Sequence, residues 1–221
     1  EAGLPLSTLP QISVEALREK LGGGGLQVLD VRREPEWAAG HVPGSINIAL
    51  SGQFASWAGA LLGLAARPVL IAESQEAVSE ARMRLARIGL EDARGYLKGG
   101  VEAWIEAGLP LSTLPQISVE ALREKLGGGG LQVLDVRREP EWAAGHIEGA
   151  GWWPLDNFKV APPEIDRDVP IAVHCKGGYR SMIACSLLER AGFRNVTNMV
   201  GGFDAWQQAG LPVVTEKPVE A

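Results

Sequence analysis

The fold is decided by a segment that occurs twice. Residues 1–41 read EAGLPLSTLPQISVEALREKLGGGGLQVLDVRREPEWAAGH, and residues 106–146 repeat these letters without a change. A recent duplication of the segment and an error of sequence assembly would both explain so complete an identity. Beyond it the halves diverge, yet they close on similar stretches, LKGGVEAW at 97–104 and MVGGFDAW at 199–206. Because self-similarity at a fixed period indicates a repeated structural unit, we expect two copies of one domain, residues 1–105 and 106–221.

A short linker follows the closing tryptophan of each copy. It reads EAGLP at 106–110 and QAGLP at 208–212. The chain itself begins with EAGLP at 1–5, without a tryptophan before it. Two explanations are open. Either the duplication carried a linker to the N-terminus, or the chain is the C-terminal part of a longer protein.

The composition is that of a globular protein with an acidic charge balance. Of 221 residues, 46% are hydrophobic, and 21 Lys and Arg stand against 27 Asp and Glu, which gives a net charge of -6. Binding to nucleic acid needs cationic groups against phosphate, so we expect no nucleic-acid partner. No charge occurs between residues 42 and 66, but the proline, glycines and serines there argue against a membrane helix. With two cysteines and no signal-peptide pattern at the start, we expect a cytoplasmic protein with no membrane partner.

Within each copy, short apolar strands alternate with helices, a pattern typical of an α/β fold with a parallel sheet. The expected helices lie at 14–21, 76–88, 119–126 and 181–191. The expected strands lie at 26–31, 68–72, 131–136 and 170–174. Ligands of such sheets bind beyond the carboxyl ends of the strands. We therefore expect Asp135, Arg137 and the loop beginning at Cys175 to share one edge of the second sheet.

The loop around Cys175 combines features that favour an anion and a thiolate. It reads HCKGGYRS at 174–181, between a predicted buried strand and the start of a predicted helix. Two glycines let successive backbone N–H groups turn inward, the helix adds the positive end of its dipole, and Lys176 and Arg180 add full charges. Such surroundings stabilise a thiolate, which makes Cys175 the candidate nucleophile. The alternative is a buried and inert cysteine, the usual state of a free thiol.

The second cysteine, Cys185, lies among apolar residues of the predicted helix, where we expect a packing role. It stands 10 positions after Cys175, so the two form neither a CxxC redox pair nor a metal clip. Three histidines and two cysteines in the whole chain leave no visible cluster of metal ligands, and we expect no metal.

Three stretches, in this order, resemble the rhodanese (sulfurtransferase) family. DVRREPEWAAGHIEGA at 135–150 is similar to the family's first signature, the loop at Cys175 to its active-site loop, and GGFDAW at 201–206 to its closing signature. The resemblance implies two tandem rhodanese-like domains, each a parallel sheet of about five strands flanked by helices. It also implies a sulfurtransferase without a cofactor, because the sulfur is carried as a persulfide on the cysteine.

The length of the loop separates two chemistries within this superfamily. In the phosphatase-like relatives five residues separate the cysteine from the arginine, whereas four separate Cys175 from Arg180. In the resembled family the shorter loop implies sulfur transfer, and it disfavours a hydrolase acting on phosphate or arsenate.

The resemblance further implies a role for each residue of the site. Cys175 would attack the outer sulfur of a small anionic donor, thiosulfate or a persulfide, and pass it to a thiol or cyanide acceptor. Arg180 would act with it, and the residues expected to bind the donor are Lys176, Gly177, Gly178, Tyr179 and Ser181. The residues expected to brace the loop are Asp135, Arg137 and His146. For Trp152 and Trp153, lining the mouth of a pocket and packing in the core are both open.

The first copy lacks these features. When the copies are aligned on the proline that begins the second strand, Glu73 falls opposite Cys175, or Ser74 after a slip of one residue. The stretch ESQEAVS at 73–79 has no thiol, no glycine and no cation, and its carboxylates would repel an anionic donor. We expect the first domain to be catalytically inactive. The residues that it retains, with an expected structural role, are Asp30, Arg32 and His41.

Two classes of function are open. One is a tandem sulfurtransferase with a single working site at Cys175, and the other is a non-catalytic sulfur-carrier, sensing or partner-binding module, which the inactive first copy favours. A wider resemblance concerns pairs with an inactive first and an active second copy. Such pairs are similar to the C-terminal part of metallo-β-lactamase-fold fusion proteins of sulfur metabolism. It implies an N-terminal metallo-β-lactamase-fold domain, absent from this chain, as a partner.

Overall fold

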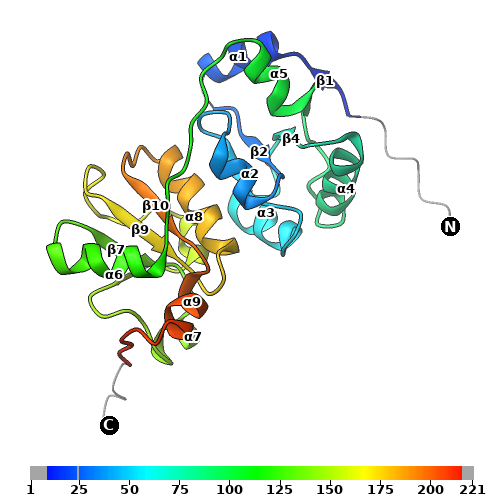
Figure 1. The fold of residues 1–221 in the computed structure, drawn as a ribbon. Helices are drawn as coiled ribbons and strands as arrows, with labels where there is room; N and C mark the ends of the chain where they lie inside the picture. The colour runs from blue at the N-terminus through cyan, green and yellow to red at the C-terminus, as the bar shows by residue number, and fades with distance from the viewer. Residues whose placement is uncertain (1–8, 24, 216–221) are drawn as a thin grey trace. The chain divides into compact units, whose positions relative to one another are not determined.

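The computed structural model describes residues 9–23 and 25–215, so the EAGLP sequence at 1–5 lies outside the described residues. The chain forms two compact units and two five-stranded parallel sheets (Figure 1). This confirms the expected α/β fold with two copies of one architecture. No helix in the two described ranges is long and apolar enough to cross a membrane.

The first sheet has the strand order β1-β5-β4-β2-β3, with β4 in the centre. Its strands are β1 (Gln11–Ile12), β2 (Val28–Asp30), β3 (Ile46–Asn47), β4 (Val69–Ile71) and β5 (Gly95–Leu97). The helices of this half are α1 (Val14–Gly22), α2 (Glu34–Ala39), α3 (Phe54–Leu62), α4 (Gln75–Ala86) and α5 (Gly100–Glu106).

The second sheet repeats this topology in the order β6-β10-β9-β7-β8, with all of its pairings parallel. Its strands are β6 (Gln116–Ile117), β7 (Gln132–Asp135), β8 (Gly151–Trp152), β9 (Ile171–His174) and β10 (Val196–Met199). Its helices are α6 (Val119–Gly128), α7 (Glu139–Ala143), α8 (Tyr179–Arg190) and α9 (Gly202–Gln208), with a 3₁₀ turn η1 (Leu155–Lys159). The buried strand β9 is central, so whatever follows it lies between the ends of two neighbouring strands.

The helix starts follow local capping chemistry. The hydroxyls of Ser13 and Ser118 accept the N–H groups of Ala16 and Ala121, both at 3.2 Å, as expected for N-caps. Helix α8 begins at Tyr179, two residues earlier than the sequence indicated. The reason is that Gly178 is its N-cap with φ 114°, a left-handed conformation that glycine adopts at little cost.

A tryptophan ties the end of each closing helix to the chain that follows it. The indole Nε1 of Trp104 donates to the carbonyl of Pro110, and that of Trp206 donates to the carbonyl of Pro212, both at 2.9 Å. Both indoles are buried, and burial without a partner for the indole N–H would be costly. The linker after each tryptophan is therefore part of the folded domain.

Candidate active site

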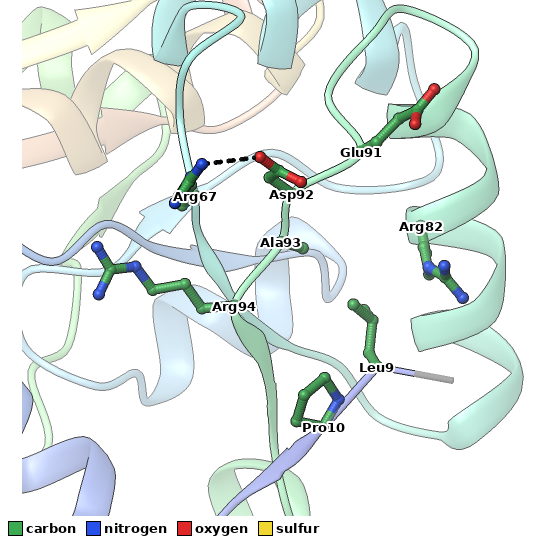
Figure 2. A pocket seen from close by; sticks show the side chains of 8 residues that line it. All are labelled: Leu9, Pro10, Arg67, Arg82, Glu91, Asp92, Ala93 and Arg94. Carbon is green, nitrogen blue, oxygen red and sulfur yellow. Dashed lines mark hydrogen bonds and ion pairs between the residues drawn. The ribbon is translucent and has the colours of Figure 1, made fainter. Parts of the chain in front are cut away.

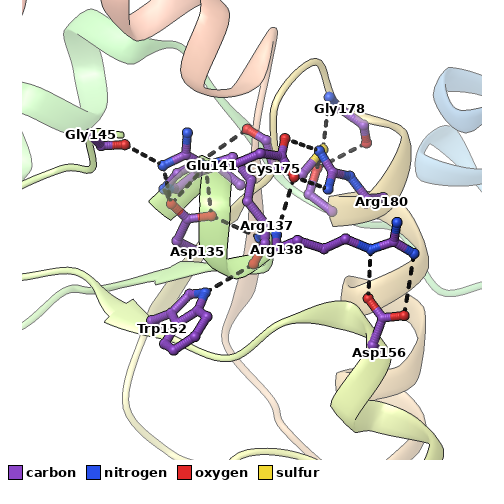
Figure 3. Close-up of polar contacts among 12 residues, drawn as sticks. Asp135, Arg137, Arg138, Glu141, Gly145, Trp152, Asp156, Cys175, Gly178 and Arg180 are labelled. Carbon is purple, nitrogen blue, oxygen red and sulfur yellow. Dashed lines mark hydrogen bonds and ion pairs between the residues drawn. The ribbon is translucent and has the colours of Figure 1, made fainter. Parts of the chain in front are cut away.

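Cys175 lies directly after β9, where the chain turns into α8. The residue is 1% exposed, and its Sγ accepts the N–H of Gly178 at 3.1 Å (Figure 3). The hydroxyl oxygen of Ser181, in the first turn of α8, lies 3.7 Å from the same sulfur. The first helical bond of α8 runs from the N–H of Met182 to the carbonyl of Gly178 at 3.2 Å. The sulfur therefore sits beside the positive end of a helix, where negative charge is favoured.

The start of α9 holds the cysteine loop in place through two backbone hydrogen bonds. The carbonyl of Cys175 accepts the N–H of Phe203 at 2.8 Å, and the carbonyl of Lys176 accepts the N–H of Asp204 at 3.0 Å. Gly202 permits this approach, because a Cβ at that position would lie 2.6 Å from the carbonyl oxygen of Cys175. The second glycine of the closing signature thus serves the cysteine loop.

A chain of hydrogen bonds holds the buried side chain of Ser181. Its hydroxyl lies 2.7 Å from Oδ1 of Asn198 and 2.9 Å from the carbonyl of Gly178, so its single proton has two acceptors. The side-chain amide of Asn198 in turn donates to Oε1 of Gln116 at 2.8 Å. Sequence reasoning gave Asn198 and Gln116 no role, since neither belongs to a recognisable motif.

Arg180 forms an ion pair with the carboxylate of Glu141. Its Nη1 and Nη2 donate to Oε2 and Oε1 of Glu141 at 2.6 and 2.7 Å, a two-pronged ion pair (Figure 3). Hydrogen bonding from Arg180 lowers the pKa of Glu141, and hydrogen bonding from Glu141 raises the pKa of Arg180. Glu141 stands in the quoted first signature, but the sequence analysis gave it no role. Its signal was a carboxylate in the helix after β7, at the same edge of the sheet as the cysteine loop.

Asp135 and Arg137 form a buried pair at the end of β7. Nε of Arg137 lies 2.9 Å from Oδ2 of Asp135 and Nη2 lies 2.6 Å from it, while the N–H of Arg137 reaches Oδ1 at 2.9 Å. Nη2 also donates to the carbonyl of Gly145 at 2.7 Å, and the guanidinium carbon lies 3.8 Å from the ring centre of Phe203. These contacts connect the end of β7 to helix α9, whose first N–H groups bond to the cysteine loop.

Two histidines also lie near this edge of the second sheet. The ring of His146 stacks on Trp142 with 3.7 Å between centroids, and its Nδ1 donates to the carbonyl of Trp142 at 3.1 Å. His174 is fully buried, and its Nδ1 donates to the carbonyl of Cys175 at 3.2 Å. Burial lowers the pKa of His174, although Asp135 lies 3.6 Å from its Nε2 and opposes the shift. His174 thus bonds to the first residue of the loop, a contact that the sequence analysis did not predict.

The remaining residues of the predicted site lie around the loop. Lys176 and Gly177 are exposed, and Tyr179 is half-buried at the start of α8. Trp152 stacks on Trp142 at 5.9 Å between centroids and donates from Nε1 to the carbonyl of Arg137 at 2.9 Å. Trp152 is 37% exposed, so it is no core residue. Trp153 is half-buried, with its Nε1 on the carbonyl of Ala161 at 3.3 Å.

Cys185 has the surroundings of a packing residue. It is fully buried in α8, and burial raises the pKa of its thiol well above the ordinary value. Within residues 9–23 and 25–215 no group of three or more His, Cys, Asp or Glu is arranged to hold a metal ion.

In the first copy, the sheet register shows which residue replaces the cysteine. Asp30 of β2 lies opposite Ile71 of β4, just as Asp135 of β7 lies opposite His174 of β9. Because Asp30 and Asp135 are the same position of the repeat, Ile71 takes the place of the histidine. The next residue, Ala72, takes the place of the cysteine. This corrects the sequence alignment, which was one or two residues too far along the chain.

The turn of the first copy is also shorter. Only Glu73 and Ser74 separate Ala72 from α4, whereas three residues separate Cys175 from α8. The hydroxyl of Ser74 accepts the N–H of Ala77 at 3.2 Å and caps α4. The first copy therefore has neither the thiol nor the glycine that presents an N–H to it.

A pocket of about 560 Å³ lies elsewhere in the first copy, between the start of β1 and the turn before β5 (Figure 2). Three arginines line it, but Arg67 donates to Asp92 at 3.0 Å, and Arg82 and Arg94 point in opposite directions (Figure 2). The cations do not converge on a common point, so the pocket does not form an anion site.

Comparison with known proteins shows which family the chain resembles. The rhodanese-like domain family matches residues 13–107 and 118–209. A sulfurtransferase of Allochromatium vinosum is 33% identical over 100 residues, which cover 45% of this chain and 94% of that protein. The thiosulfate sulfurtransferase GlpE of Pseudomonas fluorescens is 38% identical over 96 residues, which cover 42% of this chain and 83% of that protein.

Among solved structures, a rhodanese-related protein of Thermoplasma volcanium is 31% identical, covers 46% of this chain and 99% of its own, and has a TM-score of 0.43. The two sulfurtransferases named above each span about one of the two copies. The two family matches together account for most of the chain, and the two sheets share one strand order. The chain belongs to the rhodanese-like domain family and carries two copies of that domain in tandem.

Proposed function

We propose that the chain is a sulfurtransferase in which Cys175 carries the transferred sulfur as a persulfide. The observation that carries this proposal is the bond from the N–H of Gly178 to Sγ of Cys175, 3.1 Å long, at the start of α8. A donated N–H and a helix N-terminus both stabilise a thiolate and, after transfer, a negatively charged persulfide. The similarity to a thiosulfate sulfurtransferase supports thiosulfate as one donor.

The transfer proceeds in two displacements. The Cys175 thiolate attacks the sulfane sulfur of thiosulfate, the new Sγ–S bond forms, and the S–S bond of the donor breaks. Sulfite leaves with the bonding electron pair, and no redox partner is consumed. A thiol or cyanide then takes the outer sulfur and restores the thiolate. Because Cys175 is 1% exposed, small donors are favoured over bulky ones.

An intact-mass experiment tests the proposal, and the second cysteine, Cys185, serves as its control. The protein is incubated with thiosulfate, and its intact mass is measured before and after treatment with cyanide. We expect a gain of one sulfur, about 32 Da, that cyanide removes, because a persulfide intermediate is covalent. Cys185→Ala is expected to retain the adduct, and Cys175→Ser to lose it. No adduct in the wild type, or an equal adduct in Cys175→Ser, would overturn the proposal.

The second candidate is a sulfur-carrier or partner-binding module. It is favoured by the first copy, in which Ala72 takes the place of the cysteine. The two candidates differ in turnover: an enzyme releases thiocyanate from thiosulfate and cyanide repeatedly, whereas a carrier releases a single equivalent.

We propose a catalytically inactive domain over residues 1–105 and a catalytically active one over residues 106–221. The location in the cytoplasm and the N-terminal metallo-β-lactamase-fold partner stay predictions from the sequence.

A further inference from the structure

The pair of Arg180 and Glu141 determines how much positive charge the site offers. Both guanidinium nitrogens of the fork are taken by both carboxylate oxygens, at 2.6 and 2.7 Å. Oε2 of Glu141 also accepts the N–H of Arg138 at 3.2 Å, which fixes the carboxylate to the start of α7. The side chain of Arg180 is only 16% exposed and that of Glu141 only 30%, so water screens the ion pair incompletely. At neutral pH both groups are charged, and the net charge of the pair is zero.

The other cation at this edge of the sheet is neutralised as well. Arg137 is 3% exposed and shares its charge with the buried carboxylate of Asp135. Among the described residues of the cysteine loop, Lys176 is the one cation for which no ion pair is found, and it is exposed. The sequence therefore suggests a more positive site than the geometry provides. A site of low net charge attracts a monoanion nearly as well as a dianion.

We propose that Glu141 is a specificity-determining residue, which neutralises Arg180 and thereby shifts the preference of the site away from the thiosulfate dianion and toward sulfane-sulfur donors with one negative charge. The inference rests on the proposed function. Donors of this class are persulfide anions R–S–S⁻ and thiosulfonates R–SO₂–S⁻. With a persulfide anion, the Cys175 thiolate forms the Sγ–S bond, the donor's S–S bond breaks, and the thiolate R–S⁻ leaves with the electron pair. The charge is minus two before and after the step.

Two donors that differ by one charge test this inference. Thiosulfate and benzenethiosulfonate both transfer a sulfane sulfur from a sulfonyl group, and kcat/KM for each is measured by thiocyanate release at low salt. The readout is the ratio of the two values, thiosulfate over benzenethiosulfonate. Glu141→Gln leaves Arg180 unneutralised, and we expect it to raise this ratio about fivefold to tenfold, the Coulomb effect of one charge in a partly solvated site. In 0.5 M salt the gain is expected to shrink, because exposed charges are screened.

A charge series separates this effect from structural loosening. Arg180→Gln should lower the ratio below the wild-type value, and the double variant Glu141→Gln with Arg180→Gln should return it to that value. Asp156→Asn is the matched control, because it also removes one carboxylate charge, and Asp156 pairs with Arg138 at 3.1 Å rather than with Arg180 (Figure 3). It should leave the ratio unchanged.

The two proposals fail in different ways. If neither donor places sulfur on the wild-type protein, the proposed function is overturned. If both donors do so but the ratio is the same in all four members of the series, the role of Glu141 is overturned while the sulfurtransferase stands. A ratio that changes equally in Asp156→Asn would also overturn it.

Discussion

Gly202 lies against the carbonyl group of Cys175, and a Cβ at this position would stand 2.6 Å from the oxygen. The backbone of Gly202 has φ +59°, a left-handed conformation that other residues adopt only with strain. The next N–H along the chain, that of Phe203, bonds to the same carbonyl. The closing signature and the cysteine loop therefore form one structural unit, although they lie far apart in the sequence.

Replacing Gly202 by alanine should destabilise the second domain and remove its sulfur transfer. The backbone would have to move, because the added Cβ clashes with a main-chain oxygen rather than with a flexible side chain. We expect a loss of roughly 2–4 kcal/mol in the free energy of unfolding, from strain and a displaced loop. Gly149→Ala is the control, because Gly149 has φ +75° but nothing within 4 Å of its Cβ position. It should cost only about 1 kcal/mol. Equal losses in denaturant unfolding would contradict the close-contact explanation.

The buried pair of Asp135 and Arg137 should be far more sensitive than an exposed pair nearby. Asp135→Asn leaves the 3% exposed guanidinium of Arg137 without its counter-charge, and we expect a loss of about 3–5 kcal/mol in unfolding free energy. Asp156→Asn breaks the exposed pair with Arg138, and we expect a loss below about 1 kcal/mol. Urea titration of both variants decides the matter, and similar midpoints would show that the buried pair is not a brace.

His174 should make the second domain sensitive to mild acid. Burial lowers the pKa of its imidazole below the ordinary 6.5, so the unfolded chain takes up the proton at a higher pH than the folded protein. The unfolding free energy therefore falls as the pH drops below 6.5, by up to about 1.4 kcal/mol per pH unit for one proton. His174→Asn retains a donor for the carbonyl of Cys175 and cannot titrate. Its stability should depend less on pH between 7 and 5 than that of the wild type, and parallel curves would refute the assignment.

Placing a cysteine in the first copy should not create a second site. In a Cys175→Ser background, Ala72→Cys puts a thiol after β4, but the turn is one residue too short and has no glycine. We expect no sulfur adduct in an intact-mass measurement with thiosulfate. Replacing Glu73 and Ser74 by Lys-Gly-Gly in the same protein restores the length of the turn and should restore some adduct. An adduct with Ala72→Cys alone would show that the turn does not matter.

The sequence predicted the architecture because the repeat and the alternation of strands and helices are local patterns. It also predicted a loop at Cys175 after a buried strand, and the structure brings Gly178 and Ser181, three positions apart at the start of α8, to the sulfur. The predicted helix begins two residues late, because a left-handed glycine such as Gly178 can belong to a loop or cap a helix. These features depend on neighbouring residues, which a single sequence displays directly.

The contacts that the sequence did not predict join distant segments. Glu141 and Arg180 are 39 positions apart, and their pairing depends on how α7 faces the start of α8. The bonds from Asn198 and Gln116 to the Ser181 network depend in the same way on sheet order. The error of one or two residues in the position that corresponds to Cys175 in the first copy has a similar cause. An alignment on the proline does not contain the pairing of the strands, and the strand register places Ala72 at the cysteine position.

The two backbone bonds beneath the loop make helix α9 a reporter of its state. The amide hydrogens of Phe203 and Asp204 are held by the carbonyls of Cys175 and Lys176, and they reach solvent only when the loop separates from the helix. Hydrogen–deuterium exchange at these two amides consequently measures how often the loop opens. A donor that must displace the loop to reach the sulfur accelerates that exchange, so the approach of substrate can be followed at positions that it never touches.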